Sequence, residues 1–167
     1  GGPGADEMDG LGGNDRMFGH SQSGAGDDNA ADIIRGDDGN DHIEGQGGAD
    51  TLEGGPGIDM IFGWAGADMI LGGPGNDQLF GMDGDDQIFA GAGLDLVEGG
   101  AGADQINGDD DDDRLFGHSE SGAGDDGATD RIFGDDGNDL IEGQAGSDEL
   151  HGGEGIDRVF GHREDGS

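Results

Sequence analysis

The chain has 167 residues, of which 43 are glycine and 29% are hydrophobic, and its formal net charge is −35. So few apolar residues with so much like charge are typical of disordered segments. The absence of cysteine excludes disulfides and thiolate metal sites. The acidic charge argues against nucleic acid and anionic lipid, and no apolar run is long enough for a membrane-spanning helix. The partner that this charge favours is a cation.

The sequence repeats with a period of nine residues. The stretch Gly72–Phe80, GGPGNDQLF, is preceded by GWAGADMIL and followed by GMDGDDQIF. Counted back from the end of each repeat, the sixth place is always Asp, and the eighth is always Met, Ile, Leu or Val. The fourth place is Gly except at Ala30, Asp111 and Ala128. The chain therefore reads as sixteen tandem repeats, which begin at residues 1, 10, 19, 36, 45, 54, 63, 72, 81, 90, 99, 108, 117, 134, 143 and 152.

A second period of 98 residues lies over the first. The segment Met17–Gly63 recurs with few changes at Leu115–Gly161. Each copy contains one repeat of seventeen residues, which predicts longer loops at residues 19–32 and 117–130. No proline- or serine-rich linker divides the chain, so we predict one domain over residues 1–167. The start of the long repeats is echoed once more at residues 160–166, which suggests a fragment of a larger protein.

Each repeat predicts a glycine-rich turn followed by a very short β-strand. A glycine every few residues excludes helices. Places seven to nine follow the turn and are free of glycine, so we expect strands of about three residues, such as Gln78–Phe80. Neighbours in a strand point to opposite faces, so Leu79 faces inward while Gln78 and Phe80 face outward. Parallel stacking would then build a buried apolar ladder from Ile61, Leu79, Val97 and Leu115.

These repeats resemble the nonapeptide GGxGxDxUx of the repeats-in-toxin (RTX), or haemolysin-type calcium-binding, proteins. The resemblance covers residues 1–160. It implies an all-β fold, a right-handed parallel β-roll (a β-helix solenoid) with two nonapeptides per turn and about eight turns. It also implies calcium ions between successive turn loops, and a module that is not itself an enzyme.

The residue types also suit calcium. Ca²⁺ takes six to eight hard oxygens from carboxylates and backbone carbonyls, and a tight glycine turn exposes carbonyls. The resemblance implies that each ion is shared by a sixth-place Asp and by carbonyls of the loop about eighteen residues away. Two files of eight loops offer up to roughly fourteen such sites, or about +28 of charge, against the formal −35.

The expected ligands are the sixth-place aspartates, arranged in two files. By the implied two-per-turn pattern, Asp59, Asp77 and Asp95 share one file. Asp50, Asp68, Asp86 and Asp104 share the other. The whole expected set is Asp6, Asp15, Asp32, Asp41, Asp50, Asp59, Asp68, Asp77, Asp86, Asp95, Asp104, Asp113, Asp130, Asp139, Asp148 and Asp157.

A thin core and strong self-repulsion predict a chain that is disordered without calcium and folds cooperatively with it. The resemblance implies export by a type I secretion system and folding outside the cell, in secreted or surface-attached form. The residues GGPGADEMD at the start carry no Sec-type signal, which fits that route. Two alternatives stay open: a spacer or adhesive repeat of a surface protein, and an accessory module of a secreted hydrolase whose catalytic domain lies elsewhere.

Departures from the repeat raise separate questions. Asp111 replaces a fourth-place glycine, and because Asp tolerates the left-handed region we expect the turn to survive with altered affinity. In the long loops, Asp27, Asp28, Asp125 and Asp126 could bind a further ion, but a bulge that interrupts the file is the favoured interpretation. His20 and His118 lie next to serines, but without an oxyanion hole we expect no catalysis there.

All seven phenylalanines occupy the ninth place, on the outer face. Five of them fall in even-numbered repeats, which places them on one face if the long repeats keep the two-per-turn count. Outward Phe62, Phe80 and Phe116 could form a surface for self-association or a protein partner. The alternative, which we favour, is that the rings stack on their neighbours and shield the sheet.

Overall fold

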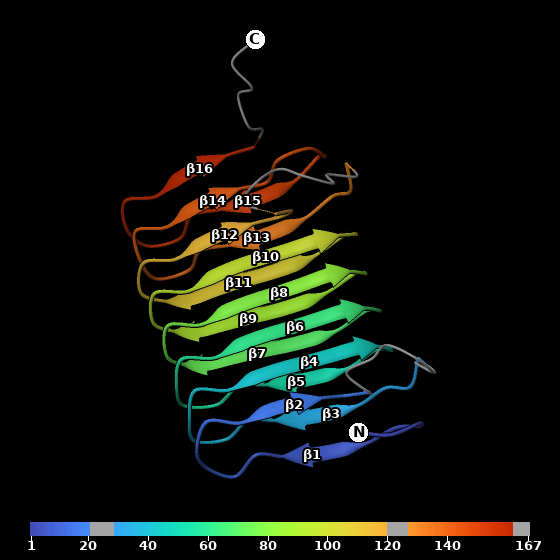
Figure 1. Ribbon diagram of the computed structural model, residues 1–167. Helices are drawn as coiled ribbons and strands as arrows, with labels where there is room; N and C mark the ends of the chain where they lie inside the picture. Colours follow the sequence, from blue (N-terminus) through green and yellow to red (C-terminus); the bar gives the residue numbers. More distant parts are fainter. Residues whose placement is uncertain (21–28, 120–126, 162–167) are drawn as a thin grey trace.

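The computed structural model describes residues 1–20, 29–119 and 127–161, which form sixteen β-strands and no helix. The strands stack into two layers, with β1 at one end of the stack and β16 at the other (Figure 1). Strands alternate between the layers along the chain, so two nonapeptides make one turn. The described residues thus form the predicted all-β parallel solenoid, in which seven turn-to-turn steps join the eight strands of each sheet.

Each layer is a parallel sheet. The odd sheet contains β1 (Glu7–Asp9), β3 (Ile33–Arg35), β5 (Thr51–Glu53), β7 (Met69–Pro74), β9 (Gln87–Ala92), β11 (Gln105–Asp110), β13 (Arg131–Phe133) and β15 (Glu149–His151). The even sheet contains β2 (Arg16–Phe18), β4 (His42–Gly47), β6 (Met60–Ala65), β8 (Gln78–Asp83), β10 (Leu96–Ala101), β12 (Arg114–Phe116), β14 (Leu140–Glu142) and β16 (Arg158–Phe160).

Residues at the same place of the repeat pair with each other across every step. Leu79 pairs with Ile61 on one side and with Val97 on the other. The long repeats keep this register, because β1 pairs with β3 and β11 pairs with β13. The predicted two-per-turn count therefore holds through both insertions.

The core is a double row of eighth-place side chains between the sheets. The twelve central members are fully buried, and Met17 at one end retains 9% exposure. Toward the other end Leu150 is only partly buried and Val159 is 42% exposed. The predicted apolar ladder is confirmed, and it contains Ile34, Ile43, Leu52, Ile61, Ile70, Leu79, Ile88, Val97, Ile106, Leu115, Ile132 and Ile141.

The expected strand length of about three residues is wrong for the middle of the molecule. Strands β4 and β6–β11 have six residues, because places one to three of the following repeat continue the ladder. Gly73 pairs with Gly91, and Trp64 pairs with Met82. Glycine weakens an isolated strand, but here a parallel neighbour one turn away supplies hydrogen-bond partners in the same register.

None of the described residues belongs to a helix long and apolar enough to cross a membrane.

Candidate metal-binding turns

The sixth-place aspartates form two continuous files along the edges of the solenoid. In each file, the backbone N–H of one Asp donates a hydrogen bond to Oδ1 of the Asp one turn further on. Asp59 donates in this way to Asp77 (2.9 Å), and Asp77 donates to Asp95 (2.7 Å). The same bond links Asp50 to Asp68 and Asp86 to Asp104. All sixteen aspartates singled out from the sequence therefore lie in one of the two files.

The second oxygen of these carboxylates is directed into the turn. In ten of the described aspartates, Oδ2 is buried and has no hydrogen-bond partner in the protein. A buried carboxylate oxygen in this state is costly unless a cation or a donor accompanies it. The ten are Asp15, Asp41, Asp59, Asp68, Asp77, Asp86, Asp95, Asp104, Asp113 and Asp139.

First-place glycines leave the room in which these oxygens gather. A Cβ added to Gly108 would lie 2.6 Å from Oδ2 of Asp113 and 2.7 Å from the carbonyl oxygen of Gly134 one turn away. A side chain at position 108 would meet both oxygens, so glycine keeps this space open there, whereas the first place of the tenth repeat is Ala90. Carboxylate and carbonyl oxygens therefore converge at the turn edge, and these are the ligand types that Ca²⁺ prefers.

The electrostatics of the files also favour a cation. Burial, together with the negative charge of the neighbouring carboxylates Asp86 and Asp130, raises the pKa of Asp104 to about 8. Burial likewise raises the pKa of Asp113 to about 8 and that of Asp77 to about 7. Like charges held in a row away from water stabilise each other's protonated form. A bound divalent cation would reverse this effect.

The arginine ion pairs lie on the outer surface rather than in the turns. Arg35 contacts Glu7 (2.8 Å) and Asp9 (3.1 Å), and Arg131 contacts Glu149 (2.9 Å). Among the described residues, no group of three or more His, Asp or Glu side chains is arranged to hold a metal ion by itself. A cation in the turns would therefore need backbone carbonyls as well as carboxylates, and the convergence at Gly108 fits that requirement.

The departures from the repeat have different outcomes. Asp111 adopts a φ of +83°, so the turn survives with Asp at the fourth place, as predicted. Its effect on affinity stays a prediction. The four long-loop acids Asp27, Asp28, Asp125 and Asp126 lie outside the described residues.

The phenylalanine interpretation is partly corrected. Phe18, Phe62, Phe80, Phe116 and Phe160 do lie on strands of the even sheet. Phe62 and Phe80 are half-buried and stack with ring centroids 4.8 Å apart. The prediction that Phe116 is available for association is wrong, because it is only 1% exposed and the guanidinium of Arg114 lies 5.6 Å from its ring centroid. This packing agrees with the shielding interpretation.

A further ladder was missed from the sequence. Oδ1 of Asn40 accepts a hydrogen bond from the backbone N–H of Ile58 (3.0 Å), and Oδ1 of Asn76 accepts one from Leu94 (3.2 Å). Oδ1 of Asp85 likewise accepts a hydrogen bond from the backbone N–H of Ala103. The available signal was the frequent Asn or Asp at the fifth place, a residue type whose side chain readily bonds nearby backbone.

Fold and turns together define a parallel β-solenoid whose edges carry regularly spaced, buried carboxylates. The family model of the RTX calcium-binding nonapeptide repeat matches residues 1–25, 26–61, 44–79, 62–97, 91–128 and 124–159. These segments together span residues 1–159, and the chain belongs to this family. It is accordingly a calcium-binding repeat module, of a kind that is typically non-catalytic. No curated protein matches the chain.

Proposed function

We propose that the sixth-place aspartates of both files are the calcium ligands of this module, and that calcium drives its folding. Each Asp would contribute Oδ2, and backbone carbonyl oxygens of the adjacent turn would complete the ligand set. The observation that carries the proposal is the row of buried Oδ2 atoms without hydrogen-bond partners. Bound calcium would supply the positive charge that the turns lack, and with it the free energy that a core of one apolar side chain per repeat cannot provide.

Folding would then depend on the compartment. A chain with a net charge of −35 repels itself, so we expect it to stay open where calcium is scarce and to close where calcium is plentiful. RTX repeat proteins are typically secreted by type I systems, which export an unfolded chain. Folding after secretion is therefore the function we assign to this module within its parent protein, with an extracellular location.

A structural spacer is the second candidate. The duplicated block of 98 residues supports it, because adding whole blocks lengthens a solenoid without changing its cross-section. In either role the calcium chemistry is the same. The two roles differ in what the solenoid is attached to.

A calcium titration followed by far-UV circular dichroism tests the proposal, with the variants Asp104→Asn and Asp110→Asn. Both substitutions remove one negative charge, but Asp104 is buried in a file while Asp110 is exposed at the end of β11. Asn at position 104 can still accept the hydrogen bond from the Asp86 N–H. We therefore expect Asp104→Asn to need several-fold more calcium for folding, and Asp110→Asn to behave like the parent. An equal response of the two variants would contradict the ligand assignment.

A further inference from the structure

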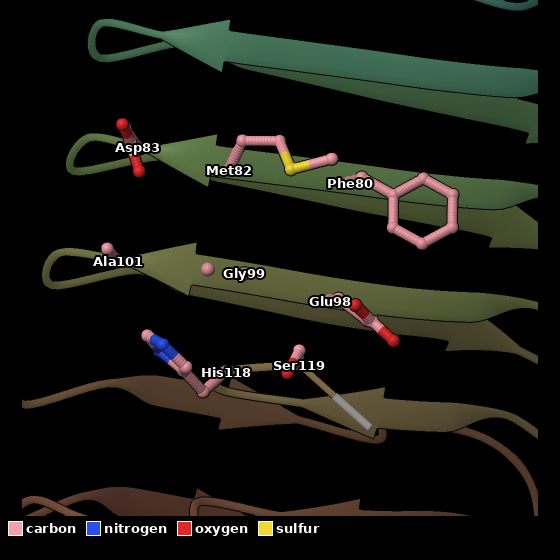
Figure 2. Close-up of a pocket in the computed structure, with 9 residues that line it drawn as sticks. Phe80, Met82, Asp83, Glu98, Gly99, Ala101, His118 and Ser119 are labelled. Atoms are coloured by element: carbon pink, nitrogen blue, oxygen red, sulfur yellow. The ribbon is translucent and has the colours of Figure 1, made fainter. Parts of the chain in front are cut away.

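The outer face of the even sheet contains a hollow that the calcium sites do not explain. Its volume is about 210 Å³. Figure 2 shows its lining: Phe80, Met82 and Asp83 from β8, Glu98 and Ala101 from β10, and His118 and Ser119 after β12.

The hollow exists because one side chain is missing from a row. The second place of the repeat on this face carries His20, Gln46, Trp64, Met82, His118 and Gln144 in the described residues. Between Met82 and His118 the corresponding residue is Gly100. Trp64 and Met82 have positive φ values of 73° and 82°, so this place accepts a side chain. Gly100 itself has a φ of +115°, and a Cβ there would collide with the carbonyl oxygen of Met82, so a side chain at position 100 would require a shift of the backbone. The absence of a side chain at Gly100 leaves the surface open.

One wall of the hollow is an aromatic ring whose two sides differ. Phe62 stacks on Phe80 from β6, at an interplanar angle of 11°. The opposite neighbour of Phe80 in the register is Glu98 on β10. One side of the Phe80 ring therefore contacts Phe62. The other side lies toward Glu98 and the hollow.

The same face shows what such a ring attracts. In three strands of this face, an arginine guanidinium lies 5.6–5.7 Å from the ring centroid of the phenylalanine two residues later. The pairs are Arg16 with Phe18, Arg114 with Phe116, and Arg158 with Phe160. In the strand of Phe80 the corresponding residue is Gln78. Phe80 is thus a ninth-place ring of the same kind that no arginine of its own strand covers. Asp83 and Glu98 add negative charge at the rim.

We propose that this hollow binds the guanidinium group of an arginine side chain from a basic partner protein. The cation would lie against Phe80 by a cation–π contact and reach the carboxylates of Glu98 and Asp83. The partner is a different protein rather than a second copy, since this chain has 6 basic residues against 41 acidic ones and two copies repel each other. This binding is separate from the calcium sites, which lie at the turn edges.

The test uses the calcium-loaded chain and N-acetyl-arginine N-methylamide as the probe, with binding followed by NMR chemical shifts and calorimetry. We expect saturable binding with shift changes centred on Phe80 and His118. The neutral isostere N-acetyl-citrulline N-methylamide should bind at least roughly tenfold more weakly, because it lacks the charge. Equal binding of the two probes would overturn the proposal. Tighter binding of choline would also overturn it, because choline is a cation without a guanidinium group.

Matched variants separate the hollow from general attraction to an acidic protein. Phe80→Leu removes the ring against which the cation would lie, so we expect binding to weaken about fivefold or more. Phe89→Leu makes the same change at the same place on β9 of the odd sheet, and it should leave binding unchanged. Glu98→Gln should weaken binding, whereas Glu142→Gln, at the same place two turns further on, should not. An equal effect within either pair would refute the site.

Discussion

The middle of the solenoid and its C-terminal part use the same repeat with different results. Strands β6–β11 have six residues, whereas β12–β16 have three. The ladder between β8 and β10 continues to the pair Asp83–Ala101, but that between β10 and β12 stops at Glu98–Phe116. The chain enters the second long repeat at Gly117. Each six-residue strand pairs with at least one other six-residue strand, so a full strand requires a neighbour that also continues past the ninth place.

From β6 onward, burial decreases only at the C-terminal end of the stack. The core residues of β6–β14 are fully buried, while Val159 and Phe160 of β16 are 42% and 40% exposed. The aspartates whose pKa burial raises to about 7 or 8, Asp77, Asp104 and Asp113, also lie in or beside the middle. The region with the best packing is thus also the region with the greatest need for a cation. We expect it to depend most strongly on calcium.

The largest expected effect comes from a fourth-place glycine in the middle. Gly66 has a φ of +131°, and a Cβ there would meet the carbonyl oxygen of Gly48 one turn away. We expect Gly66→Val to cost at least about 4 kcal/mol, through backbone strain and separation of the turns, and to abolish the calcium-induced β signal in circular dichroism. The control is Asp111→Gly, the reverse change at the same place, which should be neutral or stabilise by up to about 1 kcal/mol. A Gly66→Val protein with the same melting temperature as the parent would contradict the requirement for glycine at this turn.

Shortening a core side chain should also cost more stability in the middle of the solenoid than at its C-terminal end. Leu79 is fully buried between Ile61 and Val97, so Leu79→Ala should cost about 3 kcal/mol in saturating calcium. Val159→Ala at the exposed end should cost less than about 1 kcal/mol. Denaturant unfolding measures both free energies. Similar costs would mean that the two regions are equally well packed.

On the outer face of the even sheet, we expect a substitution in the middle strands to cost less stability than one beside the long repeat, which is the opposite of the order in the core. Phe116, directly before the second long repeat, is 1% exposed, whereas the central Phe80 is only half-buried. We expect Phe116→Ala to cost about 3 kcal/mol and Phe80→Ala about 1–2 kcal/mol, measured by the same unfolding experiment. A larger cost at Phe80 would show that the ring stack with Phe62 matters more than burial.

The smallest expected effect concerns the fifth-place ladder. Asn76→Ala removes the acceptor for the Leu94 N–H and should cost about 1 kcal/mol. Asn138→Ala removes the equivalent acceptor for Ile156 and an exposed hydrogen bond from Nδ2 of Asn138 to Asp112. Because the turn near the C-terminal end is more exposed, we still expect a smaller cost than for Asn76→Ala. Thermal melts of the two variants in saturating calcium compare them. A larger loss for Asn138→Ala would contradict the division into regions.

The sequence predicted the features that depend on the period alone. The nine-residue spacing placed Leu79 in the core and Asp77 in its file, because equal spacing brings equal places into register. Strand length was predicted wrongly, because the pairing of Gly81–Asp83 depends on partners one turn away and not on local propensity. The burial of Phe116 was missed for a similar reason, since strand alternation gives only the face on which a side chain lies. Packing on that face depends on neighbours such as Arg114.

Hydrogen–deuterium exchange of the intact chain, with excess calcium and with excess chelator, tests the central claim most directly. The claim predicts that amides of β6–β11 are strongly protected with calcium, those of β12–β16 less so, and that both regions exchange at unfolded-chain rates in chelator. Protection of β6–β11 that persists in chelator would contradict it, because the buried carboxylates of the two files would then be tolerated without a cation.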